Sequence, residues 1–212
     1  MDSEDVVLAQ DAEFVSFDIP RDVLASLTLL AHSLERAPKQ DLWWKWAVVS
    51  AHMAANSALV GFLSHTSGVG PLSDESTRKL LVWNTQPSAR SDPPPDRIAE
   101  FTVLLERTAS GAAGFGAPLR VMTLVEPLTR LNWVRGRFNH FRDEGWLIER
   151  EYLRPLLLAA IDLVDEVFQH GWAFRHGSDD LRSELTKLLM QVRGALEAGS
   201  QQLNEREGCA DA

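Results

Sequence analysis

The sequence lacks the cysteines that stabilise small secreted proteins. Its only cysteine, Cys209, lies in a polar tail, which excludes an intrachain disulfide and a cysteine-based zinc cluster. The acidic first residues, 1–5, also lack the basic stretch and the apolar run of a secretory signal peptide. We therefore expect a cytoplasmic protein in which Cys209 is an incidental residue.

Positive charge is scarce as well. The 212 residues carry a formal net charge of -9. Non-specific binding to nucleic acids depends mostly on cations placed against phosphates, so the net charge argues against a broad interface of that kind. Any contact with RNA must be confined to a local basic surface.

The sequence also has no uninterrupted run of apolar residues long enough to span a bilayer. Residues 43–63 come closest, but Lys45, His52 and Asn56 interrupt them, and such side chains are costly in lipid. We interpret this segment as a buried core helix and expect no membrane partner.

Neither internal repeats nor segments that alternate between apolar and polar residues are present, whereas apolar residues recur at helical spacing. The pattern predicts an all-α fold, an antiparallel helical bundle. We expect one domain over residues 18–198, an N-terminal arm at 1–17 and a disordered tail at 199–212. Helices are expected at about 21–36, 41–65, 73–83, 97–108, 119–141, 149 or 153–169, and 179–197.

Local signals indicate where several helices begin. Asp18 and Pro20 introduce the first helix, and Asp96 is expected to cap the helix at 97–108, which would carry Ile98 inward. Pro127 either kinks the helix at 119–141 or starts a fresh helix within its first turn. The pattern alone does not decide between these two.

Most familiar catalytic signatures are missing. No histidine follows a glutamate at the Glu-x-x-His spacing of di-iron bundles, and there is no Gly-x-Ser-x-Gly elbow. The glycine-rich segment at 110–118 has neither a preceding strand nor the lysine of a phosphate-binding loop, which favours a flexible connector. We expect no cofactor and no metal. The scattered histidines are interpreted as structural or solvated residues: His32, His52, His65, His170 and His176.

Residues 131–141 form a helix whose three faces separate at about 100° per residue. They are a core stripe (Leu131, Val134, Phe138, Phe141), a polar stripe (Asn132, Arg135, Asn139, Arg142) and a third face (Trp133, Arg137, His140). Arg135 and His140 lie about 140° apart, with Gly136 between them leaving a notch. The alternative is that Arg135 is merely solvated and His140 sits favourably near a helix C-terminus.

Arg135, four intervening residues and His140 near the end of a helix resemble the Arg-x4-6-His motif of the HEPN superfamily. The wider string Leu-Asn-x-x-Arg-x-x-Phe-Asn-His-Phe, followed by Gly-Trp-Leu-Ile-Glu and a leucine-rich helix, is similar to bacterial HEPN-like proteins over about residues 128–168. Elsewhere the likeness is only that the chain is helical. The sequence departs from the family at Gly136, where a polar residue is common.

The resemblance implies a HEPN-like bundle that dimerises with the motif helices facing each other. It also implies a metal-independent endoribonuclease of the toxin–antitoxin or phage-defence type. Its Arg135 would hold the scissile phosphate, His140 would act as acid and base, and Asn139 would support them. The expected partners are an RNA substrate, a second copy of the chain and an antitoxin or regulatory protein. The rival reading is a non-catalytic HEPN-like module for dimerisation or protein interaction.

Overall fold

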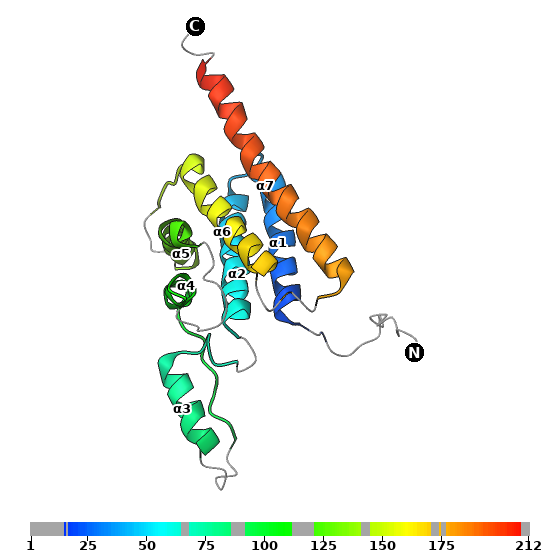
Figure 1. Ribbon diagram of the computed structural model, residues 1–212. Helices are drawn as coiled ribbons and strands as arrows, with labels where there is room; N and C mark the ends of the chain where they lie inside the picture. Colours follow the sequence, from blue (N-terminus) through cyan, green and yellow to red (C-terminus); the bar gives the residue numbers. More distant parts are fainter. Residues whose placement is uncertain are drawn as a thin grey trace, which may run out of the picture.

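The computed structural model describes residues 15, 17–64, 68–85, 92–111, 121–140, 145–170, 174 and 177–208, with side chains as far as residue 198. Over these residues the chain forms seven α-helices and no strand, so the all-α prediction is confirmed. Figure 1 shows their arrangement. The elements are α1 (Ile19–Arg36), α2 (Leu42–Ser64), α3 (Asp74–Thr85), α4 (Phe101–Ala109), the 3-10 turn η1 (Met122–Leu124), α5 (Val125–Asn139), α6 (Arg150–His170) and α7 (Asp179–Gly208).

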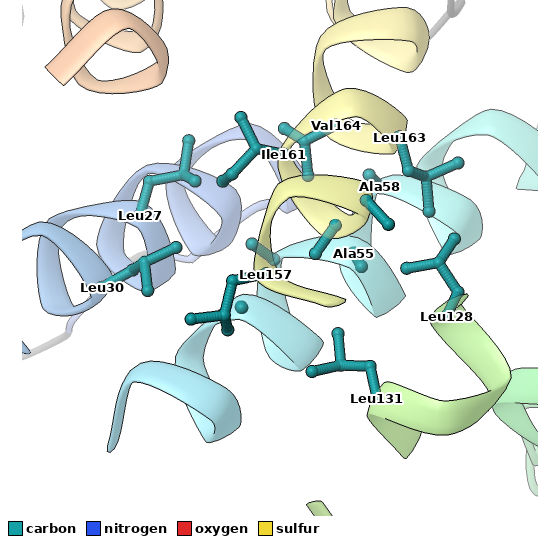
Figure 2. Packing of buried hydrophobic residues seen from close by; sticks show 14 of the residues in the cluster. Leu27, Leu30, Ala55, Ala58, Leu128, Leu131, Leu157, Ile161, Leu163 and Val164 are labelled. Atoms are coloured by element: carbon teal, nitrogen blue, oxygen red, sulfur yellow. The ribbon is translucent and has the colours of Figure 1, made fainter. Parts of the chain in front are cut away.

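Helix α2 is the centre of the core, where it packs against α1, α4, α5 and α6 (Figure 1). Its buried positions are largely small, which lets neighbouring helices approach closely: Ala47, Ala51, Ala54, Ala55, Ala58 and Gly61. Figure 2 shows Ala55 and Ala58 among leucines of α1, α5 and α6. Among the described residues α2 is the one helix long and apolar enough to cross a membrane, and most of it is buried within the fold.

Helices α1 and α2 run antiparallel. The Asp18 carboxylate accepts a hydrogen bond from the Arg21 backbone N–H at 2.8 Å, with proline in the first turn, so α1 begins as its sequence predicts. Near that end of α1, Asp22 accepts a hydrogen bond from Ser57, late in α2. At the other end Arg36 lies over the ring of Trp43, early in α2.

Helices α6 and α7 complete the core against α1 and α2 (Figure 1). Arg193 of α7 pairs with Asp162 and Asp165 of α6, at 2.6 and 3.4 Å. The sequence predicted that α7 ends near residue 197 and that a disordered tail follows. The structure instead continues the helix to Gly208.

Helix α3 projects away from the other helices (Figure 1). The chain leaves and re-enters the body at one point, where Ser73 N–H donates to Arg97 O at 2.8 Å and Leu72 forms a bridge with Ile98. This pairing corrects the sequence prediction for the next helix. Because the backbone at 97–99 is paired with the chain before α3, α4 begins at Phe101 rather than 97. Asp96 is not its cap, and Ile98 is 46% exposed instead of buried.

The motif helix α5 starts afresh after η1, with Pro127 in its first turn, which decides between the two readings of that proline. The remainder of the predicted helix, residues 119–120 and 141, lies outside the described residues, as does most of the expected arm at 1–17. Helix α6 starts at Arg150 and contains Pro155 on its exposed side. Water can satisfy the carbonyl that this proline leaves unpaired.

Leu157 and Ile161 are fully buried on α6, facing α1 and α2 (Figure 2). We expect Leu157→Ala to lower the free energy of unfolding by about 2–5 kcal/mol, because it removes core contacts and leaves a cavity. Urea unfolding followed by circular dichroism measures this. Leu147→Ala is the control, since Leu147 is fully exposed and its truncation should cost less than about 0.5 kcal/mol. A loss below about 1 kcal/mol for Leu157→Ala would contradict this packing.

Candidate functional site

Helix α5 presents the faces that its sequence predicts. Leu128, Leu131 and Val134 are buried against the core, and Phe138 is half-buried. The members of the polar stripe differ in burial: Asn132 and Arg135 are half-buried, whereas Asn139 is exposed. The remaining members of the two stripes, Phe141 and Arg142, lie outside the described residues.

A polar cluster joins α5 to the core of the bundle. His52, from α2, is only 5% exposed, and its Nε2 lies 2.9 Å from Oδ1 of Asn132. A neutral imidazole protonated at Nε2 donates this hydrogen bond to the amide oxygen. The other side of the ring packs on Phe101 of α4, with ring centroids 4.4 Å apart. Three helices therefore meet at His52, with the charge of Arg135 nearby.

The surroundings of His52 keep its imidazole neutral. Burial removes water from the charged form, and the nearby Arg135 guanidinium repels it; together they lower the pKa of His52 from 6.5 to about 4. The hydrogen bond with Asn132 acts in the opposite direction but is the weakest of the three effects. At neutral pH the cluster thus contains one fixed positive charge, that of Arg135.

Arg135 has no acceptor for its side chain within the described part of the chain. Its Nε is shielded from solvent and makes no hydrogen bond, and no carboxylate forms an ion pair with it. Other arginines are matched: Arg130 pairs with Glu126 on the same helix, and Arg107 pairs with Asp74. A buried N–H without an acceptor costs free energy, whereas the terminal nitrogens of Arg135 are not among the buried unpaired atoms and can bind water.

His140 and Asn139 lie at the C-terminal end of α5, and both are exposed. His140 is the C-cap residue, and its backbone N–H donates to Gly136 O at 3.0 Å. Within the described residues, no hydrogen bond or ion pair joins either side chain to Arg135. The structure therefore gathers Asn132 and Arg135 around His52 and leaves His140 and Asn139 on the open surface of the same helix.

The sequence pattern places His52 among several scattered structural or solvated histidines and does not indicate where it lies in the fold. It is structural, but it is also the residue on which Asn132 and Arg135 converge. The available signal was a polar side chain on a helix apolar nearly all round, since a buried polar group needs a partner. Nothing in the sequence selected that partner, which lies 80 residues away.

Five arginines and the single acid Glu126 lie between residues 118 and 142, which indicates a local basic surface around the motif. Arg120 and Arg142 lie outside the described residues, and Arg130 is paired with Glu126. Among the described residues of this stretch, Arg135 and Arg137 are the cations that form no ion pair. Across the described residues, no cluster of three or more histidine, cysteine, aspartate or glutamate side chains is arranged to hold a metal ion.

No protein-family model matches the chain, and neither curated proteins nor solved structures give a match. The functional reading therefore depends on the geometry of α2 and α5.

The buried histidine should make stability depend on pH. Between pH 6.5 and 4 the unfolded chain protonates His52 whereas the folded chain does not, so the free energy of unfolding falls as pH decreases through this window. The total loss from this residue is on the order of 3 kcal/mol, and it is absent above pH 6.5. We expect His52→Gln to lose less stability than wild type between pH 7.5 and 4.5, as measured by urea unfolding.

His32→Gln is the matched control, because His32 is exposed on α1. Its pH profile should follow that of wild type, so that carboxylates common to all three proteins cancel in the comparison. Equal slopes for wild type and His52→Gln would contradict a buried, neutral His52.

Proposed function

We propose that this chain is a HEPN-like antiparallel bundle that acts as a metal-independent endoribonuclease of the toxin–antitoxin or defence type. The observation that carries the proposal is Arg135, whose buried Nε has no hydrogen-bond partner and whose guanidinium forms no ion pair within the described residues. A phosphodiester offers two oxygens in the plane of the guanidinium fork and neutralises its charge. RNA bound there would supply the acceptor that the described residues do not.

Proton transfer in this scheme falls to His140. It caps the C-terminal end of α5, which contains no histidine itself, and imidazole is the side chain suited to exchanging protons near neutral pH. It would remove the proton of the ribose 2′-hydroxyl and return one to the leaving 5′-oxygen, which gives a 2′,3′-cyclic phosphate end. Asn139, exposed beside it, would hold the phosphate or the ribose by hydrogen bonding. His52 is excluded from this role because it is buried.

A single chain does not present Arg135 and His140 on one side of α5, since about 140° separates them around the helix axis. A second copy can bring its own pair to the same cleft. We therefore include a homodimer in the proposal, with the two α5 helices flanking a shared site. Gly136 allows close approach there, because a Cβ added to it would meet nothing within 4 Å.

Helix α2 offers a surface for this second copy. The α2 stripe follows the heptad spacing of helix-to-helix seams: Leu42, Trp46, Val49, Met53, Asn56 and Val60. Leu42 is 71% exposed, Trp46 45% and Met53 42%, so these three positions are not covered by the bundle itself, while the other three are half-buried. A two-fold axis at the level of Ala51 would place Val49 of one copy opposite Met53 of the other. Arg135, which packs near His52, would then lie beside that axis in both copies.

The same stripe favours the alternative function. A non-catalytic dimerisation or protein-interaction module needs an exposed apolar face and no chemistry, and the α2 stripe provides one. An antitoxin or regulatory protein that presents an amphipathic helix is the partner expected for such a module.

We expect wild type to form a dimer of about twice 23.6 kDa, and Met53→Glu to form a monomer, because a carboxylate would be buried without a partner in the seam. Light scattering over the micromolar range measures the masses. Met190→Glu is the control, since Met190 is exposed on α7 away from the stripe. A wild-type mass of one chain at all concentrations would overturn the dimer.

The catalytic test uses purified protein, EDTA and an RNA of mixed sequence. Wild type should produce cyclic phosphate ends, and His140→Ala should fold normally yet lose at least about a hundredfold in rate, the usual contribution of a positioned acid or base. Arg135→Ala should weaken RNA binding, and Arg135→Lys should not restore it, because an ammonium lacks the bidentate fork.

His170→Ala is the matched control, since His170 is likewise an exposed histidine at the end of a helix, α6. Cleavage that persists in His140→Ala would eliminate the assigned mechanism. A wild-type protein without any bound partner that cleaves nothing would favour the interaction module.

A further inference from the structure

One face of α5 is used neither by the core nor by the cluster around His52. Trp133, Gly136, Arg137 and His140 follow one another at the i, i+3, i+4, i+7 spacing that places residues along one side of a helix. We call this set the indole face. Its two ends, Trp133 and His140, are seven residues apart, which is a rise of roughly 10 Å along the axis.

The aromatic part of this face is fixed in place by a cation. The guanidinium carbon of Arg137 lies 5.8 Å from the ring centroid of Trp133 and 5.5 Å from that of Trp146. Trp146 packs in turn on the half-buried Phe138, with centroids 4.8 Å apart. Such contacts restrict the motion of both indoles. Trp133 nevertheless remains 59% exposed, an orientation that leaves ring surface open to solvent.

Charge and shape on this face suit a nucleotide. In the part of the chain that the structure describes, Arg137 forms no ion pair, and its contacts are with the two rings. Its N–H donors therefore remain available to an anion beside the exposed indole. Between Trp133 and His140, the position of Gly136 is open, because an added Cβ would meet nothing within 4 Å. The indole face thus offers an aromatic ring for stacking, a guanidinium that can bind a phosphate, and open space at Gly136.

We infer that Trp133 is a stacking platform for an unpaired base of the RNA substrate, with Arg137 holding the adjacent phosphate; this inference depends on the proposed function. Bases of single strands and loops stack on exposed aromatic rings, whereas the bases of a duplex are covered on both faces by their neighbours. The stacked base binds on the same side of α5 as His140 and adds to the affinity for the substrate. The substrate class is therefore single-stranded RNA or the unpaired loop of a hairpin.

Binding can be measured apart from cleavage in a His140→Ala background. The probe is a fluorescein-labelled single-stranded RNA of mixed sequence, followed by anisotropy at fixed salt. Adding Trp133→Ala should raise Kd about 5- to 100-fold, the range expected for loss of one stacked base, whereas Trp133→Phe should retain most of the affinity. Phe17→Ala is the control, since Phe17 is an exposed aromatic residue that precedes α1. A fully paired duplex of the same sequence should bind more weakly and show no dependence on Trp133.

Kinetics give the second readout. With His140 intact, Trp133→Ala should raise KM and leave kcat within about threefold, because stacking stabilises the bound substrate and the transition state alike. Unchanged Kd and KM in Trp133→Ala would overturn the stacking platform, while cleavage dependent on His140 would still stand. Absence of RNA binding by the His140→Ala protein, together with absence of cleavage by wild type, would overturn both. Equal loss of affinity for single-stranded and duplex RNA would also contradict base stacking.

Discussion

The structure depends on the close packing of one helix, α2, against its neighbours. Alanines line much of its buried surface, so α1 and α6 approach it with leucines filling the space between them (Figure 2). A larger side chain at Ala55 or Ala58 would push α6 outward, and with it α5, which packs on both α2 and α6. The placement of the motif helix is thus a consequence of small residues on a helix that carries no part of the motif.

The burial of His52 on α2 also determines that its imidazole carries no charge, whereas the nearby Arg135 is charged. His52 is buried where α2, α4 and α5 meet, and it remains neutral at physiological pH because burial and Arg135 both oppose its protonation. The amide oxygen of Asn132 accepts the hydrogen bond from Nε2 of His52. It would therefore bind a ligand more weakly than an unoccupied amide oxygen. Within the described residues no carboxylate pairs with Arg135, so its charge is not compensated by this part of the chain.

Local signals predicted much of this fold. Asp18 and Pro20 define the start of α1, and the spacing of Leu157 and Ile161 identifies the inward side of α6. Local signals gave a wrong prediction where backbone pairing with a distant part of the chain competes with helix formation. Asp96 has the chemistry of a helix cap, but the backbone after it pairs with Ser73 and Leu72 instead, which delays α4 by four residues. The pairing of His52 with Asn132 has no local signal, since it follows from how three helices meet.

The bridge between Leu72 and Ile98 also marks the boundary between α3 and the other helices. Arg107 of α4 reinforces the junction by donating to Gly70 O at 2.9 Å and Leu72 O at 2.7 Å, besides its ion pair with Asp74. The two chain segments that lead into and out of α3 are therefore held together by contacts with each other and with Arg107 of α4. We therefore expect changes of length or composition within the α3 excursion to leave the positions of α2 and α4 unaffected. This excursion is consequently the place where lineages can diverge in sequence, and where a reporter domain can be inserted, without moving the helices that hold His52 and Arg135.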